Sequence, residues 1–244
     1  MHIKKFLILK NYIDFVKSKF NKRPFVSYSQ CGEDLIVCYI FQYLGIKKPT
    51  YLDIGAHHPF HTSNTALLYK NGSSGVCVEP YPTLFKYIKK KRKRDICLNV
   101  GVGTDSEKKM PDFYMMSSKG LSTFSKSEAE RFSKEEGQMI TAIIKIPILS
   151  INKIISDNFK EKPNFISIDI EGMDFKVLND LDFNKYRPEV FCVETLTYTR
   201  YSKGQKLNNI IEFMKEKNYF VYADTYMNTI FVDNIFWSKT NLCI

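Results

Sequence analysis

Residues 50–59, with the sequence TYLDIGAHHP, constrain the fold of this chain more than any other stretch. The apolar residues before Gly55 indicate a short buried strand, and the glycine lets the backbone turn tightly where a larger side chain would meet a ligand. A second apolar run ends in Glu79, 26 residues after Asp53. This spacing is typical of consecutive strand ends in a strand–helix–strand unit, where the second acid can accept the hydroxyl hydrogens of a ribose. The pattern predicts a nucleotide-like cofactor at the turn, although both acids could instead cap helices.

The rest of the chain alternates between apolar strand-like runs and amphipathic helical patterns. Further strands are expected at residues 95–100, 164–168, 188–193, 219–223 and 230–237. The last two runs must pair antiparallel, because the link between them is too short for a crossover helix. We therefore predict an α/β fold with a mostly parallel, Rossmann-like seven-stranded sheet and a C-terminal antiparallel strand pair. Its ligand crevice should lie at the carboxyl ends of the strands, where the strand order reverses.

Two additions to this fold are expected. Residues 1–48 form an N-terminal helical extension, whose first 23 residues look like a basic amphipathic helix that packs on the body or on a partner. The cofactor-binding domain then covers residues 49–244. Within it, residues 104–149 break the alternation and suggest an inserted hairpin with a mobile flap, which would serve as a lid on the acceptor side.

Charge and cysteine content limit the environment and the partners. The net charge is +10, and a basic run at residues 86–94 supplies much of it. We interpret this run as a solvated helix face, while nucleic acid, an anionic membrane surface or substrate phosphates remain alternatives. The six cysteines form no Cys-x-x-Cys pair, which favours a reducing cytoplasm, and no apolar run is long enough to span a bilayer. The sequence leaves self-association open.

Acidic residues follow the expected fourth and fifth strands. Asp169 and Glu171 come directly after the fourth strand, and Glu194 ends the fifth. Neighbouring strands lie about 5 Å apart, so these side chains should converge with the end of the first strand on one pocket. Several carboxylates in one pocket repel each other unless a proton or cation is present. We therefore predict a divalent metal, Mg²⁺ or Mn²⁺, held by these three acids.

Two readings of this cluster stay open at the level of the sequence. His57 and His58 follow the first strand, and His58 could be a metal ligand or either histidine a general base. Alternatively, Glu171 caps the next helix and Glu194 pairs with a basic residue such as Arg200.

Three amides could also face the cofactor. Gln30 stands where a second helix begins, although an ordinary capping role is equally compatible with its position. Asn64 belongs to the start of another helix, whose free amides and hydroxyls suit a carboxylate. Asn99 ends the third strand, beside the strand of Glu79, on the side where an adenine would lie.

Six motifs, taken as a set, resemble those of FkbM-type methyltransferases over roughly residues 27–195. They are SQCGED at 29–34, LDIGAHHP at 52–59, SNT at 63–65, VEPYP at 78–82, LST at 121–123 and IDIEG at 168–172. The resemblance implies a class I S-adenosylmethionine-dependent O-methyltransferase acting on sugars, sugar nucleotides or polyketide hydroxyls. It also implies that Asp53 and Gly55 border the methionine part of the cofactor, that Glu79 holds the ribose and that Asn99 lies near adenine. Metal ligation by Asp169 and Glu194 follows other metal-dependent O-methyltransferases.

The predicted function is therefore O-methylation of a sugar, a sugar nucleotide or a surface polysaccharide precursor, as expected for a cytoplasmic bacterial enzyme. Asp169, His57 and His58 are the expected catalytic residues, and Asp169 would also contact the cofactor. The alternatives are a nucleic-acid methyltransferase that uses residues 86–94 and a methyltransferase of polyketide-type molecules, but we expect no nucleic-acid partner. A nicotinamide oxidoreductase is disfavoured, because residues 53–55 replace the Gly-x-Gly-x-x-Gly turn.

Overall fold

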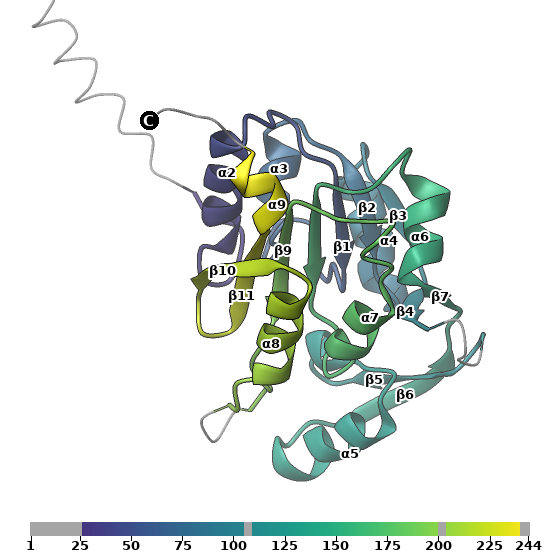
Figure 1. The fold of residues 1–244 in the computed structure, drawn as a ribbon. Helices are drawn as coiled ribbons and strands as arrows, with labels where there is room; N and C mark the ends of the chain where they lie inside the picture. The colour runs from purple at the N-terminus through teal and green to yellow at the C-terminus, as the bar shows by residue number, and fades with distance from the viewer. Residues whose placement is uncertain (1–25, 105–108, 200–203, 240–244) are drawn as a thin grey trace, which may run out of the picture.

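The computed structural model describes residues 26–104, 109–199 and 204–239. A seven-stranded sheet forms its centre, in the order β10-β11-β9-β8-β1-β2-β3 (Figure 1). The strands are β1 (Tyr51–Ile54), β2 (Gly75–Val78), β3 (Ile96–Leu98), β8 (Phe165–Ile168), β9 (Val190–Glu194), β10 (Tyr219–Asp224) and β11 (Asn228–Asp233). Strand β11 runs antiparallel to both of its neighbours, and the other pairs are parallel. The predicted sheet and its antiparallel C-terminal pair are confirmed.

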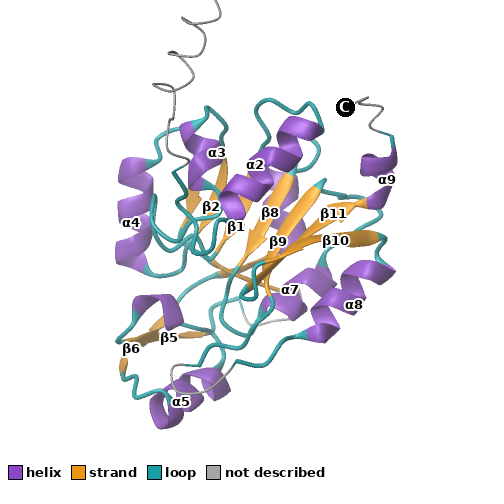
Figure 2. Ribbon diagram, turned by 90° about the vertical axis from the view of Figure 1, so that its left-hand side faces the viewer, coloured by secondary structure: helices purple, strands orange, loops and turns teal. Residues whose placement is uncertain are grey.

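Helices cover both faces of this sheet (Figure 2). Their bounds are α2 (Glu33–Tyr43), α3 (Ala66–Lys70), α4 (Pro82–Lys91), α6 (Ile151–Asn158), α7 (Asp174–Asp180), α8 (Asn208–Glu216) and α9 (Asn234–Ser238). Side chains of β1 alternate between the faces: Leu52 and Ile54 join the apolar core under α6, α7 and α8, whereas Tyr51 joins the core under α2 and α3. The sheet is therefore buried on both sides, as expected for parallel strands.

The insertion forms its own small layer below the carboxyl ends of the strands (Figures 1 and 2). Strands β4 (Gly101–Gly103) and β7 (Ile148–Ser150) pair in parallel and frame it. Between them lie the antiparallel pair β5 (Asp112–Met116) and β6 (Ile140–Lys145), the short 3₁₀ helix η1 (Lys119–Leu121) and α5 (Lys126–Glu135). The predicted hairpin is present. The polar stretch expected to be a flap is helix α5, with Phe132 fully buried on its inner side.

Other expectations meet different outcomes. The strand expected over residues 230–237 ends at Asp233, because the Asp233 side chain accepts a hydrogen bond from the Ile235 amide and starts α9. The predicted N-terminal helix lies outside the described residues. The division after residue 48 stays a prediction, although α2 packs its apolar face on the same core as β8 and β9. In the described part of the chain, we find no helix with the length and apolar character needed to cross a bilayer.

Candidate functional site

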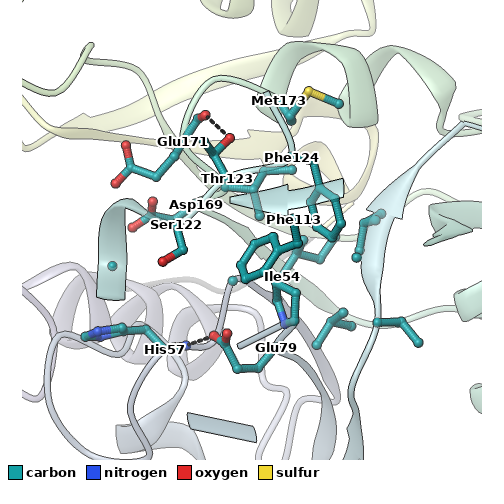
Figure 3. Close-up of a pocket in the computed structure, with 18 of the residues that line it drawn as sticks. Ile54, His57, Glu79, Phe113, Ser122, Thr123, Phe124, Asp169, Glu171 and Met173 are labelled. Carbon is teal, nitrogen blue, oxygen red and sulfur yellow. Dashed lines mark hydrogen bonds between the residues drawn. The ribbon is translucent and has the colours of Figure 1, made fainter. Parts of the chain in front are cut away.

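The main crevice lies at the point where the strand order reverses, between β1 and β8. A cavity opens there, at the carboxyl ends of the strands (Figure 3). Gly55 after β1, Glu79 after β2, and Asp169 and Glu171 after β8 line it. The cavity therefore has the position that the sequence predicts for a ligand site.

Gly55 allows the loops after β1 and β8 to meet. Its φ angle of 81° lies in the left-handed region, and a Cβ atom at this position would come within 1.9 Å of the Asp169 carbonyl oxygen. The Cβ atom would be fixed directly to the backbone of residue 55, and the oxygen belongs to the backbone of Asp169, so neither could move aside easily. A glycine is needed here, and it brings Asp169 to the rim of the cavity.

Glu79 is held in place by two backbone amides. Its carboxylate accepts hydrogen bonds from the His57 amide at 2.8 Å and from the Tyr81 amide at 2.7 Å. Burial raises the pKa of Glu79 to about 7, and the charges of Asp53 and Asp169 add to this effect while the two amides oppose it. The fixed carboxylate closes the end of the cavity nearest β2.

Asp169, Glu171 and Glu194 come together as the sequence predicts. Each offers a carboxylate oxygen, and these oxygens lie within 4.8 Å of one another. The side chains of Asp169 and Glu171 extend to the same side of the cavity (Figure 3). Asp169 is exposed to solvent, and Glu171 and Glu194 are half-buried. Partial loss of water where protein atoms crowd the three carboxyls, followed by mutual repulsion, raises the pKa of all three, and that of Asp169 reaches about 7. The cluster would gain stability from a cation or from shared protons.

The loop after β8, which carries Asp169 and Glu171, is strained and is held by hydrogen bonds. Glu171 has a φ of 50°, which is unusual for a residue with a side chain. The buried Asp174 carboxylate accepts hydrogen bonds from the Ile170 and Gly172 amides at 3.0 and 3.2 Å, and Thr123 donates to the Glu171 carbonyl at 3.2 Å. Glu171 does not cap the next helix, since α7 follows Met173 and has no side-chain cap hydrogen bond; Asp174 in its first turn instead holds the loop. The same alternative pairs Glu194 with Arg200, which lies outside the described residues.

The two histidines take different positions. His57 lines the cavity, and burial, followed by the charges of His58, His61 and Lys119, lowers its pKa. His58 is not among the lining residues. Its ring instead packs edge-on against Tyr87 at 5.2 Å between ring centroids, and its Nδ1 accepts from a nearby amide. His57 thus lies at the cavity and His58 packs beside it, and the catalytic role of either histidine stays a prediction.

Asp53 does not reach the cavity, contrary to the role expected for it. Because side chains alternate along β1, Ile54 points to the cavity and Asp53 to the opposite face. There Thr65 Oγ1 donates to its carboxylate at 2.5 Å, and the guanidinium of Arg92 lies 3.6 Å away. Asp53 thus stabilises the turn from the face of β1 opposite the cavity.

The three predicted amides also lie outside the cavity lining. Asn64, in the segment after β1, donates a hydrogen bond to the Ser167 hydroxyl of β8 at 3.1 Å. Asn99 donates to the Glu79 carbonyl at 2.9 Å and so fixes the backbone that carries the Glu79 side chain. Gln30 is exposed at the start of α2.

Aromatic residues of the insertion form a cavity wall that the sequence reading missed. Phe113 of β5 and Phe124 line the cavity with ring centroids 4.8 Å apart. A Cβ atom on Gly101 would lie 2.4 Å from the Phe124 ring, so this glycine admits the ring. The alternating apolar pattern around residue 113 was visible in the sequence, but its pairing partners were not. The insertion therefore encloses the same cavity as Glu79.

A second cavity lies on the other side of the acids. Glu171 lines both cavities, whereas Glu194 lines the second cavity and not the first. Arg131 of α5 also lines the second cavity, where its guanidinium bonds Glu128 at 2.7 Å and the Tyr198 carbonyl at 3.1 Å. The acids thus border both cavities, with Asp169 and Glu171 lining the first and Glu171 and Glu194 lining the second.

The solved structures that match the chain do so at low sequence identity. The Burkholderia thailandensis 1,6-didemethyltoxoflavin-N1-methyltransferase, with bound 1,6-didemethyltoxoflavin and S-adenosylhomocysteine, is 9% identical; the match covers 94% of this chain and 89% of that one, with a TM-score of 0.41. The precorrin-6y C5,15-methyltransferase from Geobacter metallireducens GS-15 is 10% identical over 81% and 87%, with a TM-score of 0.40. TrmK of M. capricolum, in complex with S-adenosyl-homocysteine, is 11% identical over 80% and 68%, with a TM-score of 0.36.

Sequence comparison gives the family. No curated protein sequence matches the chain. The profile described as the Methyltransferase FkbM domain matches residues 53–221, from the end of β1 to β10. This range includes Glu79, the insertion and the three clustered acids. The chain belongs to the FkbM methyltransferase domain family.

Proposed function

We propose that this protein is an S-adenosylmethionine-dependent O-methyltransferase that acts on a hydroxyl of a sugar, a sugar nucleotide or a polysaccharide precursor, with a divalent metal. The observation that carries the proposal is the convergence of Asp169, Glu171 and Glu194 between two cavities, one of which is closed by Glu79. Membership of a methyltransferase family supplies the reaction class.

The first cavity fits the cofactor by its chemistry. Each Glu79 oxygen accepts one backbone amide and retains a lone pair for a ribose hydroxyl. Phe113 and Phe124 offer apolar surface for an adenine ring, and the glycine turn at Gly55 leaves its backbone open to the methionine part. When bound, S-adenosylmethionine supplies an activated methyl group.

The acid cluster fits a divalent metal. Hard cations such as Mg²⁺ and Mn²⁺ prefer carboxylate oxygens, and two oxygens bound to one Mg²⁺ at about 2.0–2.1 Å lie no more than about 4.2 Å apart. The oxygens of the cluster lie within 4.8 Å of one another, so a small movement of the side chains would gather them around one ion. A metal held there would offset the repulsion between carboxylates and lower the pKa of a nearby acceptor hydroxyl.

The chain itself must orient the acceptor and remove its proton. An acceptor bound in the second cavity would have to extend past Glu171, which lines both cavities, so that its hydroxyl reaches the first cavity in line with the methyl group. Because the lowered pKa keeps His57 neutral near pH 7, its imidazole can receive a proton in the first cavity. A direct test is incubation with labelled S-adenosylmethionine and a panel of sugar nucleotides and glycans, with and without chelator. Transfer to none of them, with the cofactor bound, would count against the acceptor class.

Glu79→Gln is expected to weaken S-adenosylmethionine binding by about 1.5–3 kcal/mol, because a neutral amide replaces a charged acceptor of the ribose hydroxyls. Calorimetry should also show affinity falling as the pH drops below about 7 in the unmodified protein, since the pKa of Glu79 is raised to about 7 and protonation competes with hydroxyl binding. The control is Glu212→Gln on the exposed side of α8. Unchanged affinity in a folded Glu79→Gln protein would remove the residue from the cofactor site.

The basic run of α4 is expected to be a solvated face and not a nucleic-acid site. Lys86, Lys89 and Lys90 are exposed on α4, but Arg92 is fully buried and departs from the predicted pattern. Filter binding to random RNA at physiological salt should therefore detect only weak association. Tight binding that drops steeply with added salt would instead favour a nucleic-acid methyltransferase, because such slopes report phosphate contacts.

A further inference from the structure

Glu33 is a buried carboxylate that the site described above does not use. It begins α2, within the SQCGED stretch at 29–34, and it is fully buried. Burial opposes its charge, but hydrogen bonds from Thr225, Asn228 and the Cys31 amide outweigh burial and lower the pKa of Glu33 below its ordinary value. Glu33 is therefore a buried negative charge at neutral pH, and among the described residues hydrogen bonds compensate it instead of a cation.

The hydrogen bonds of Glu33 tie the start of α2 to β11, which lies beside it (Figure 1). One carboxylate oxygen accepts from Thr225 Oγ1 at 2.7 Å and from Asn228 Nδ2 at 3.0 Å, and the other accepts from the Cys31 amide at 2.8 Å. Thr225 belongs to the connection between β10 and β11, and Asn228 is the first residue of β11. A neutral glutamine could accept the same two side-chain bonds without the cost of burying a charge. The bonds alone therefore do not call for an ionised side chain.

Asn228 is a direct neighbour of the acid cluster. Strands β11 and β9 pair antiparallel, with Asn228 opposite Glu194. The side chains of directly opposite residues share one face of a sheet, with Cβ atoms about 4.5–5.5 Å apart. Asn228 thus links Glu33 to the strand end that carries Glu194. After partial loss of water and the charges of two other acids, the charge of Glu33 also raises the pKa of Asp169.

We propose that Glu33 is a positioning residue for the cluster of Asp169, Glu171 and Glu194. Through Asn228 it fixes the end of β9, and its buried charge adds to the negative potential that attracts a divalent cation to the cluster. Partners outside the set of metal ligands commonly orient those ligands and tune the affinity of a metal site. This role of Glu33 rests on the metal of the proposed function.

The test measures binding of Mn²⁺ to the full chain by electron paramagnetic resonance. Glu33→Gln should raise the Mn²⁺ dissociation constant by about tenfold. Because ions in solution screen a buried charge poorly, the difference should persist at about 0.5 M KCl. The matched control is Asp224→Asn, which removes an exposed acid paired with a lysine at the end of β10 and should change the dissociation constant by no more than about twofold.

A second variant, Thr225→Val, keeps the charge of Glu33. It removes the hydroxyl that donates to Glu33, and the Mn²⁺ dissociation constant should rise by about threefold, because the contact with the start of β11 becomes weaker. If Glu33→Gln does not fold, Thr225→Val decides the question, and an unchanged Mn²⁺ affinity in that variant would overturn the role.

Calorimetry with S-adenosylmethionine, without added metal, separates positioning of the acids from general damage. Glu33 does not line the first cavity, so Glu33→Gln should bind the cofactor as tightly as the wild type does. An equal loss of both affinities would overturn the role. Equal Mn²⁺ binding by the wild type and Glu33→Gln would also overturn it, while the metal of the proposed function would stand. If the wild type bound no Mn²⁺, both the metal and the role of Glu33 would be rejected.

Discussion

Asp169→Asn is expected to reduce methyl transfer by about a hundredfold or more, because it removes a charged member of the acid cluster. Chelation by EDTA should have a similar effect, and Mg²⁺ or Mn²⁺ should restore the activity. Glu194→Gln should weaken the response to metal in the same way, since its oxygen belongs to the same cluster. The measurement is the rate of transfer from labelled S-adenosylmethionine as a function of metal concentration.

A second readout separates the metal from the cofactor. Electron paramagnetic resonance of Mn²⁺ reports binding without turnover, and both variants should lose the bound signal. Glu194 does not line the cavity of Glu79, so Glu194→Gln should keep its affinity for S-adenosylmethionine. Full activity in EDTA would reject the metal and leave proton removal to His57.

The sequence predicts the sheet and the acid cluster because both follow from periodicity. Strand-like runs at regular intervals determine a parallel sheet, and the carboxyl ends of its strands share one edge. Asp169, Glu171 and Glu194 all follow strands that turn out to be neighbours, so they meet as predicted. Gly55 is informative for the same reason, since it stands where two of these ends come into contact.

What the sequence could not give is the direction of single side chains and the pairing of the insertion. Asp53 and Ile54 are adjacent in the chain, and only the register of β1 decides which one faces the cavity. Phe113 lines the cavity because β5 pairs with a strand nearly thirty residues further on, and no local pattern specifies that contact. Asp174 looks like an ordinary acid at a helix start until its bonds to the loop amides are seen.

Arg92 is the sharpest example, because it stands in a run of surface lysines yet is fully buried. Its guanidinium bonds Asp95 at 2.7 Å and the Tyr51 hydroxyl at 2.9 Å, and lies 3.6 Å from Asp53. It therefore links the end of α4 to β1, directly behind the cofactor turn. Among the described residues, Arg92 is the only cation paired with the buried carboxylates of Asp53 and Asp95.

Arg92→Met is accordingly expected to lower the free energy of unfolding by about 3–5 kcal/mol near neutral pH, because removing one partner leaves buried carboxylates uncompensated. Burial already raises the pKa of Asp53, and Arg92 opposes that effect, so the pKa of Asp53 should rise further in the variant. A carboxyl whose pKa is higher in the folded than in the unfolded state destabilises the fold most above the folded-state pKa. This penalty shrinks as the pH falls below that value and is gone below the unfolded-state pKa. The loss should therefore shrink in acid.

Urea unfolding at several pH values, followed by circular dichroism, measures both the size and the pH dependence of this loss. The matched control is Lys93→Met, which removes an exposed charge next to Arg92 and should change stability by no more than about 0.5 kcal/mol. If Arg92→Met cost as little as the control, the buried network would not be what fixes β1 against α4. If the cost were large but equal at all pH values, lost packing would explain it better than the unpaired Asp53, since an uncompensated carboxylate must be relieved by protonation.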